Sequence, residues 1–163
     1  MLFVGLVADA YGRTATEDTT RQWRALRLER CRALDVFTVT FDHNDHDGHR
    51  HGRKIFSTTV DLLTHLPTSI GQVRIRMIPD PAAALDVEDG ATEPPNVLLE
   101  DLDWQALDEV LSAPRFKRLN VSLEVVTLRD AFSRDRCWKI LANIRVYLPL
   151  LSSRDMLTLL VCE

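Results

Sequence analysis

A four-residue pattern recurs along this chain and constrains its fold more than any other feature. Three tryptophans begin the related stretches WRAL (23–26), WQAL (104–107) and WKIL (138–141), and a fourth copy, VDLL (60–63), has valine instead. The first positions of successive copies lie 37, 44 and 34 residues apart. Intervals of this length are typical of supersecondary repeats, so the sequence predicts an array of similar units.

Each copy lies in a segment whose apolar residues have helical spacing. The spacing is clearest for two sets: Cys137, Ile140, Leu141, Ile144 and Leu148, and Trp104, Leu107, Val110 and Leu111. We predict an amphipathic helix around each copy, the first over roughly residues 17–33. Asp101 or Asp103 can cap the third helix and Ser57 the second. Because Trp23, Trp104 and Trp138 recur at the same position of the pattern, we expect all three to be buried.

A breaker and then an alternating segment follow each predicted helix. Proline lies in the stretches 66–71, 113–116 and 148–153, where it ends a helix because it lacks the backbone N–H. The strands that follow are predicted at 36–41, 72–78, 120–126 and 156–161. The opening MLFVGLVADA has no basic region and only a short apolar run, so it is interpreted as a buried strand and not as a signal peptide.

The four later strands alternate between an apolar and a polar set of side chains. The apolar set is Phe37, Val39, Phe41, Val73, Ile75, Met77, Val121, Leu123, Val125, Leu157, Leu159 and Val161; the polar set is Thr38, Thr40, Arg74, Arg76, Ser122, Glu124 and Thr158. A sheet covered by helices on both faces would have strands that are apolar throughout. The polar set therefore predicts helices on one face only.

The resulting prediction is an α/β fold, a short irregular leucine-rich-repeat-like solenoid with a parallel sheet and helices on one face. An ordinary two-layer α/β domain is the alternative, since the strict L-x-x-L-x-L-x-x-N signature is absent. We expect one repeat domain over 1–163, with units near 2–34, 35–66, 72–112 and 120–148 and a closing strand at 156–161. The proline-rich, acidic stretch 79–97 is expected to be a mobile insertion.

The stretch DWQALDEVLSAPRFKRLNVSLEV and the closing YLPLLSSRDMLTLLV carry a family resemblance. They resemble the leucine-rich-repeat-like C-terminal region of fungal F-box-associated proteins, in which a W-x-x-L-D helix leads through PRF into a strand. The resemblance covers residues 97–163 directly. It implies the substrate-recognition part of a ubiquitin-ligase adaptor, although the F-box module itself is missing from this chain.

A histidine-rich stretch, FDHNDHDGHRHGRK (41–54), is the candidate metal site. His43, His46, His49 and His51, with Asp42, Asp45 and Asp47, are residue types that bind zinc. Their spacing matches no closed zinc module, and an EF-hand aligned on Gly48 would have histidine at its first position and lysine at its last. We expect a solvated connecting loop that binds zinc, nickel or copper at most adventitiously. No cofactor is expected.

The polar set of the sheet is the candidate partner-binding face, made of Thr38, Thr40, Arg74, Arg76, Ser122 and Glu124. Arg74 and Arg76 lie two apart on one strand, so they can clamp a carboxylate or phosphate of a partner. Glu124 can instead form a cross-strand salt bridge with one of them, which is the arrangement we favour. No motif for a phosphate loop, a catalytic serine or a metalloprotease occurs, which favours a protein without catalytic activity.

Charge and cysteine content restrict the environment and the partners. Twenty Lys and Arg against 24 Asp and Glu leave a net charge of −4, which disfavours binding to nucleic acid or a membrane surface. Cys31, Cys137 and Cys162 are odd in number and widely spaced, so we expect buried free thiols and an intracellular protein, cytoplasmic or nuclear.

Three functional hypotheses follow. The first is a noncatalytic protein-protein interaction module, and the second is a small metal-binding or metal-dependent enzyme domain that uses the loop 42–51. The third is a fragment or degenerate copy that self-associates through exposed repeat ends, because repeat arrays need polar caps.

Overall fold

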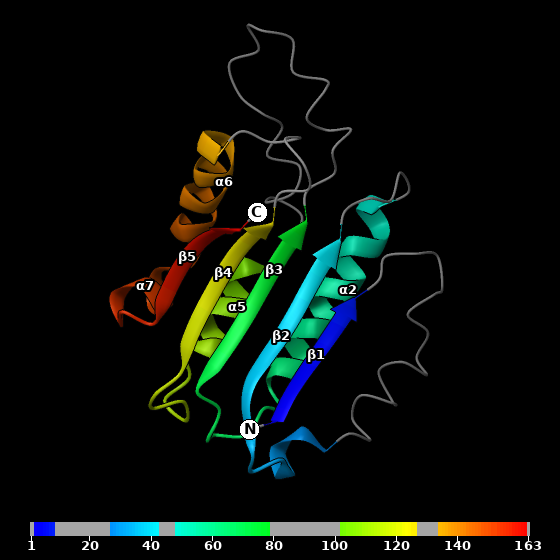
Figure 1. The fold of residues 1–163 in the computed structure, drawn as a ribbon, viewed down its shortest axis with the longest axis vertical. Coiled ribbons are helices and arrows are strands. Elements are labelled where there is room, and N and C mark those ends of the chain that lie inside the picture. Colours follow the sequence, from blue (N-terminus) through cyan, green and yellow to red (C-terminus); the bar gives the residue numbers. More distant parts are fainter. Residues whose placement is uncertain (1, 9–26, 43–47, 79–101, 127–133, 163) are drawn as a thin grey trace, which may run out of the picture.

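Five parallel strands in chain order form the centre of the protein. The computed structural model describes residues 2–8, 27–42, 48–78, 102–126 and 134–162, with the backbone alone described for 2–8, 42 and 48–55. The sheet order is β1-β2-β3-β4-β5, and every neighbouring pair is parallel. The strands are β1 (Leu2–Ala8), β2 (Leu34–Asp42), β3 (Gln72–Ile78), β4 (Asn120–Val126) and β5 (Leu157–Cys162) (Figure 1). The predicted strands, including the one at the start of the chain, are confirmed.

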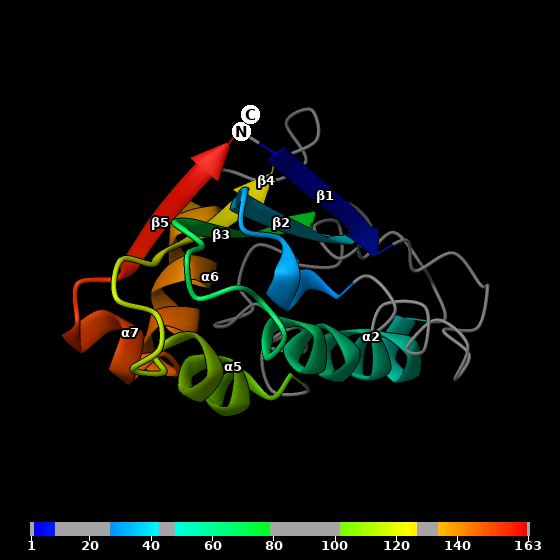
Figure 2. The same cartoon turned by 90° about the horizontal axis from the view of Figure 1, so that it is seen from below.

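The described helices lie on the same side of this sheet. They are α2 (Gly48–Leu63), α5 (Trp104–Leu111), α6 (Arg134–Val146) and α7 (Pro149–Ser153), and the short 3-10 helix η1 (Leu28–Arg30) precedes β2. Figure 2 shows all of them below the sheet and none above it. The α/β class and the parallel sheet are therefore as predicted. Among the described elements, the second face of the sheet has no helix over it.

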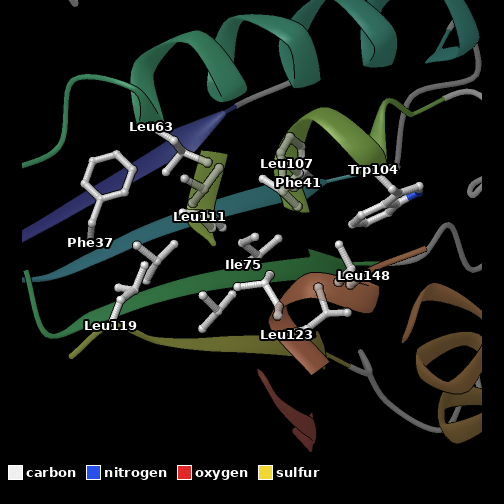
Figure 3. Close-up of a cluster of buried hydrophobic side chains, with 14 of the residues drawn as sticks. Phe37, Phe41, Leu63, Ile75, Trp104, Leu107, Leu111, Leu119, Leu123 and Leu148 are labelled. Atoms are coloured by element: carbon white, nitrogen blue, oxygen red, sulfur yellow. The ribbon is translucent and has the colours of Figure 1, made fainter. Parts of the chain in front are cut away.

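The core lies between the sheet and the helices (Figure 3). The strand register aligns apolar residues in three rows: Phe37, Val73, Val121 and Leu157; Val39, Ile75, Leu123 and Leu159; Phe41, Met77, Val125 and Val161. The members on β2, β3 and β4 are at most 8% exposed, whereas those on β5 are only half-buried. An aromatic cluster ties sheet to helices, with the Phe56 ring 5.5 Å from Phe41 and 5.1 Å from Trp104.

The recurring four-residue pattern marks core positions through its last residue. Leu63, Leu107 and Leu141 are 0%, 1% and 0% exposed. Trp104 at the first position is also buried, but Trp138 is 41% exposed, so its predicted burial is wrong. Trp138 lies one position after Cys137, which belongs to the buried stripe of α6, and a step of one residue turns about 100° around a helix. Trp23 lies outside the described residues.

Helix boundaries agree with the sequence in part. Asp103 caps α5 as predicted, because its side chain accepts a hydrogen bond of 3.0 Å from the N–H of Ala106. Ser57 does not cap α2, which begins nine residues earlier at Gly48.

Two other segments differ from the predicted helices and breakers. The stretch 148–153 contains α7, with Pro149 in its first turn, where proline is tolerated. Residues 28–30 form a 3-10 turn in place of the end of an α-helix, because the chain turns there into β2. The rest of the helix predicted at 17–33 and the insertion predicted at 79–97 lie outside the described residues.

Two arginines connect the turns before β4 and β5 to the ends of the helices α2 and α5. The guanidinium of Arg115, in the turn before β4, donates to the carbonyls of Leu63 and Thr64 at 3.0 and 2.6 Å, at the end of α2. Arg154, in the turn before β5, donates in the same way to the carbonyl of Ser112 at the end of α5. The last carbonyls of a helix have no partner within that helix. Each arginine therefore supplies a donor to carbonyls at the end of a helix that precedes it in the chain.

None of the three cysteines, all of which lie in the described ranges, forms a disulfide, and no described helix is long and apolar enough to cross a membrane. Only Cys137 is fully buried, whereas Cys31 and Cys162 are half-buried. The prediction of free thiols is therefore confirmed, and that of burial holds for Cys137 alone.

Candidate partner-binding face

The strand register brings the predicted partner-binding residues together on the face of the sheet opposite the core. We call this the inner face. One row across it contains Thr38, Arg74, Ser122 and Thr158, and the next contains Thr40, Arg76, Glu124 and Leu160. Side chains alternate along a strand, and all the residues that flank these in the chain belong to the core rows, so both rows lie on the uncovered face. All six predicted residues occupy three adjacent strands.

Arg76 and Glu124 form the cross-strand ion pair that the sequence favours. Arg76 Nε lies 3.1 Å from Glu124 Oε2, and the two residues are direct partners in the register of β3 and β4. The Arg76 side chain is 41% exposed and that of Glu124 is 9% exposed. Their alignment falls outside hydrogen-bond geometry, so the contact is an ion pair without a directed hydrogen bond at Nε. The positive charge of Arg76 therefore compensates the negative charge of Glu124 within the sheet.

Arg74 has a different environment. Its Nη2 donates to Gln72 Oε1 at 3.1 Å, and Gln72 Nε2 in turn donates to Ser122 Oγ at 3.0 Å. The Nε of Arg74 is buried and has no hydrogen-bond partner in the described part of the chain. No carboxylate pairs with this guanidinium among the described residues, which distinguishes Arg74 from Arg76.

Further members of the inner face were not among the six predicted partner-binding residues. Gln72 links Arg74 to Ser122, as described above, and Asn120 Nδ2 lies 3.3 Å from Thr158 Oγ1. Leu160 is 39% exposed beside Glu124 on the next strand. Gln72 and Asn120 lie two positions before Arg74 and Ser122, so the alternation that selected those residues also contained the signal for these two.

The accessible part of the inner face is smaller than the sequence indicates. Ser122 is 2% and Glu124 7% exposed, so these two residues contribute little accessible surface to the inner face. Both lie on β4 between two paired strands, where longer neighbours such as Arg76 and Gln72 contact them. Thr38, Thr40 and Arg74 are half-buried. The accessible part of this face is therefore formed by the threonines and the two arginines, while Glu124 contacts Arg76 directly and Ser122 is linked to Arg74 through Gln72.

The histidine-rich stretch is divided by the start of α2. His49 and His51 lie within this helix, so the expectation that they belong to a connecting loop is wrong. His43 and His46 lie outside the described residues, as do Asp45 and Asp47. Within the described ranges, no three His, Cys, Asp or Glu residues come together in a way that could hold a metal ion.

The fold and the inner face together define an α/β protein with a sequentially ordered parallel sheet. Searches of protein-family models, of curated proteins and of solved structures found no match to this chain. The inner face must therefore be interpreted from its own chemistry.

Proposed function

We propose that this chain is a noncatalytic protein-interaction module, a short leucine-rich-repeat-like solenoid that binds a protein partner through its inner face. The observation that carries the proposal is the polar row of Thr38, Arg74 and Ser122, which lies on a sheet face with no described helix over it. A strand in a globular core would have apolar residues there. Polar residues on three adjacent strands favour a surface that is used for recognition.

The charge of Arg74 defines what the partner would supply. Arg76 and Glu124 compensate each other, so Arg74 is the cation that remains for a ligand. A guanidinium binds carboxylates with two parallel hydrogen bonds, and Arg74 has donors left after its contact with Gln72. The partner segment that meets this face therefore contains an aspartate or glutamate.

The family resemblance of residues 97–163 narrows the class of partner. It favours the substrate-recognition part of an F-box-like ubiquitin-ligase adaptor, in which the bound protein is a substrate for ubiquitylation. On this proposal, a partner captured through the inner face accumulates in ubiquitylated form when the proteasome is inhibited.

Site-specific photocrosslinking tests which face binds. A photoreactive amino acid is placed at Thr38 on the inner face and, as a matched control, at Glu109, which is exposed on the outer helix α5. The proposal predicts a discrete crosslinked protein from position 38 and none from position 109. The same product from both positions, or a product from position 109 alone, would contradict it.

A further inference from the structure

The C-terminal edge of the sheet collects the exposed apolar side chains of the described structure. We call this region, made of α6, α7 and β5, the C-terminal edge. Five large apolar residues are exposed among those described, and all five lie here: Trp138, Val146, Tyr147, Leu150 and Leu160. Figure 1 shows β5 as the outermost strand with α6 and α7 beside it. Leu160 lies on the inner face and the other four on or between α6 and α7, so exposed apolar side chains lie on both sides of β5.

The outer side of the β5 backbone can pair with an extended partner. β5 pairs with β4 on one side, and no described strand pairs with its other side. The carbonyl of Met156 accepts from the N–H of Val121 at 2.7 Å, so residues 156, 158 and 160 direct their backbone groups to β4. The alternate residues Leu157, Leu159 and Val161 therefore direct their N–H and C=O groups outward. These groups are the template for one more strand.

The side chains of β5 agree with this arrangement. Leu157, Leu159 and Val161 are only half-buried, whereas Val121, Leu123 and Val125 at the same level of β4 are at most 1% exposed. The strand LTLLVC contains no charged residue, proline or glycine, which are the devices that usually protect a free edge from pairing. An added strand with apolar residues at alternate positions would complete this part of the core.

The charge of α6 distinguishes an acidic partner from a second copy of the chain. The helix has four cations and one anion, whereas the whole chain has a net charge of −4. Arg134, Lys139 and Arg145 are exposed, and α6 packs against β4 and β5. Pairing of two β5 edges would bring two copies of this basic helix together, which costs energy through like-charge repulsion. A strand with acidic residues is attracted instead.

We infer that the C-terminal edge binds an extended acidic peptide of a partner protein, which adds as a sixth strand beside β5. Its apolar residues would cover Leu157, Leu159 and Val161, and its carboxylates would meet the cations of α6. The outward backbone of β5 and the cations of α6 do not involve Arg74 or the threonines of β2, so the inference stands independently of the function proposed above.

Fluorescence anisotropy with a labelled ten-residue peptide that alternates valine and glutamate tests the inference. The control peptide alternates valine and lysine. We expect the full chain to bind the glutamate peptide at least tenfold more tightly, and the double variant Lys139→Glu with Arg145→Glu to lose at least tenfold in affinity. The variant Lys117→Glu, in the exposed turn between α5 and β4, should bind the peptide as the wild type does.

Two matched variants test strand addition. Val161→Pro removes an outward N–H without removing a hydrogen bond to β4, whereas Val161→Ala shortens the side chain and keeps the N–H. The proline variant should bind at least tenfold more weakly than the alanine variant. If Val161→Pro does not fold by circular dichroism, N-methylation of alternate amides in the peptide tests the same hydrogen bonds and should have the same effect.

Three results would overturn the inference. Equal affinity for the two peptides, or no binding of either, would show that the C-terminal edge does not select an acidic partner. Binding that depends on α6 charges but is unaffected by Val161→Pro or by peptide N-methylation would show that the peptide does not add as a strand beside β5. A wild-type dimer in sedimentation experiments that Val161→Pro dissociates would make a second copy of the chain the occupant of this edge.

Discussion

Glu124 is a carboxylate with little exposure to water, and Arg76 is the described cation that pairs with it. Removing one member of such a pair leaves a charge without compensation, whereas replacing both members by apolar residues does not. Arg76→Leu should therefore lower the free energy of unfolding by about 1–2 kcal/mol, below the value for fully buried pairs because Arg76 is partly exposed. Denaturant unfolding measures this loss.

The double variant Arg76→Leu with Glu124→Leu provides the control. It should be more stable than Arg76→Leu alone, since no unpaired carboxylate remains on β4. Equal losses of unfolding free energy in the single and the double variant would show that Arg76 does not compensate the charge of Glu124.

Cys137 is the least accessible of the three thiols. Burial raises the pKa of its thiol, and this effect exceeds the opposing influences of the nearby Arg136 charge and of a backbone hydrogen bond. Since the thiolate is the reactive form, Cys137 should react with a thiol reagent only on unfolding, while Cys31 and Cys162 react in the native protein. A count of two fast-reacting thiols at neutral pH is expected. Three fast-reacting thiols would contradict the burial of Cys137.

The same pKa shift affects stability at alkaline pH. A thiol whose pKa is raised by folding holds its proton more tightly in the native state. Its contribution to stability is therefore fully present below the pKa of the unfolded thiol and is lost as pH rises through the raised native value. Cys137→Ala should reduce this part of the alkaline loss of stability, as thermal unfolding at several pH values would measure.

Among the secondary-structure elements, α7 depends on a carboxylate from α5. Asp108 is 2% exposed, and its two oxygens accept hydrogen bonds of 2.8 and 2.9 Å from the N–H groups of Leu150 and Leu151. These donors lie in the first turn of α7, where they have no partner within the helix. Asp108 thereby fixes the approach of the chain to β5.

Asp108→Ala should lower the free energy of unfolding by roughly 2–3 kcal/mol, because two backbone donors lose their acceptor in a buried environment. Asp103→Ala, which removes the exposed cap of α5, is the matched control and should cost about 1 kcal/mol. Chemical denaturation of both variants compares them. Equal losses would contradict a special role of Asp108 in joining α5 to α7.

The strands could be predicted from the sequence, whereas the start of α2 could not. A strand with one buried face has a period of two, and Val73, Ile75 and Met77 show it directly. The start of α2 is hidden because two glycines of low helix propensity and a run of polar residues without an apolar stripe precede its core contact at Phe56. Packing of Phe56 between Phe41 and Trp104 is a tertiary contact, which no local pattern contains.

The sequence predicted which residues lie together on the inner face, but not which of the two arginines pairs with Glu124. Alternation placed Arg74, Arg76 and Glu124 on one face, yet two arginines could equally reach one glutamate in the absence of a strand register. The register of β3 and β4 aligns Glu124 with Arg76. It thereby leaves Arg74 with Gln72 and Ser122, which is the basis of the proposed recognition.

Across the whole molecule, the two faces of the sheet differ: the core and the helices lie on one face, and the proposed recognition surface lies on the other. A substitution at Arg74 tests this division most directly, because the charge of Arg74 has no acidic partner among the described residues. Changing it should affect binding without unfolding the protein.

The most direct measurement is the dissociation constant of the partner identified by crosslinking from Thr38, for the wild type, Arg74→Glu and Lys117→Glu. Lys117 is exposed in the turn between α5 and β4, so its variant has the same change of charge away from the inner face. The account predicts at least a tenfold loss of affinity for Arg74→Glu and less than a twofold change for Lys117→Glu, about 1.4 kcal/mol against a few tenths. Unchanged affinity of a folded Arg74→Glu variant would contradict recognition through the inner face.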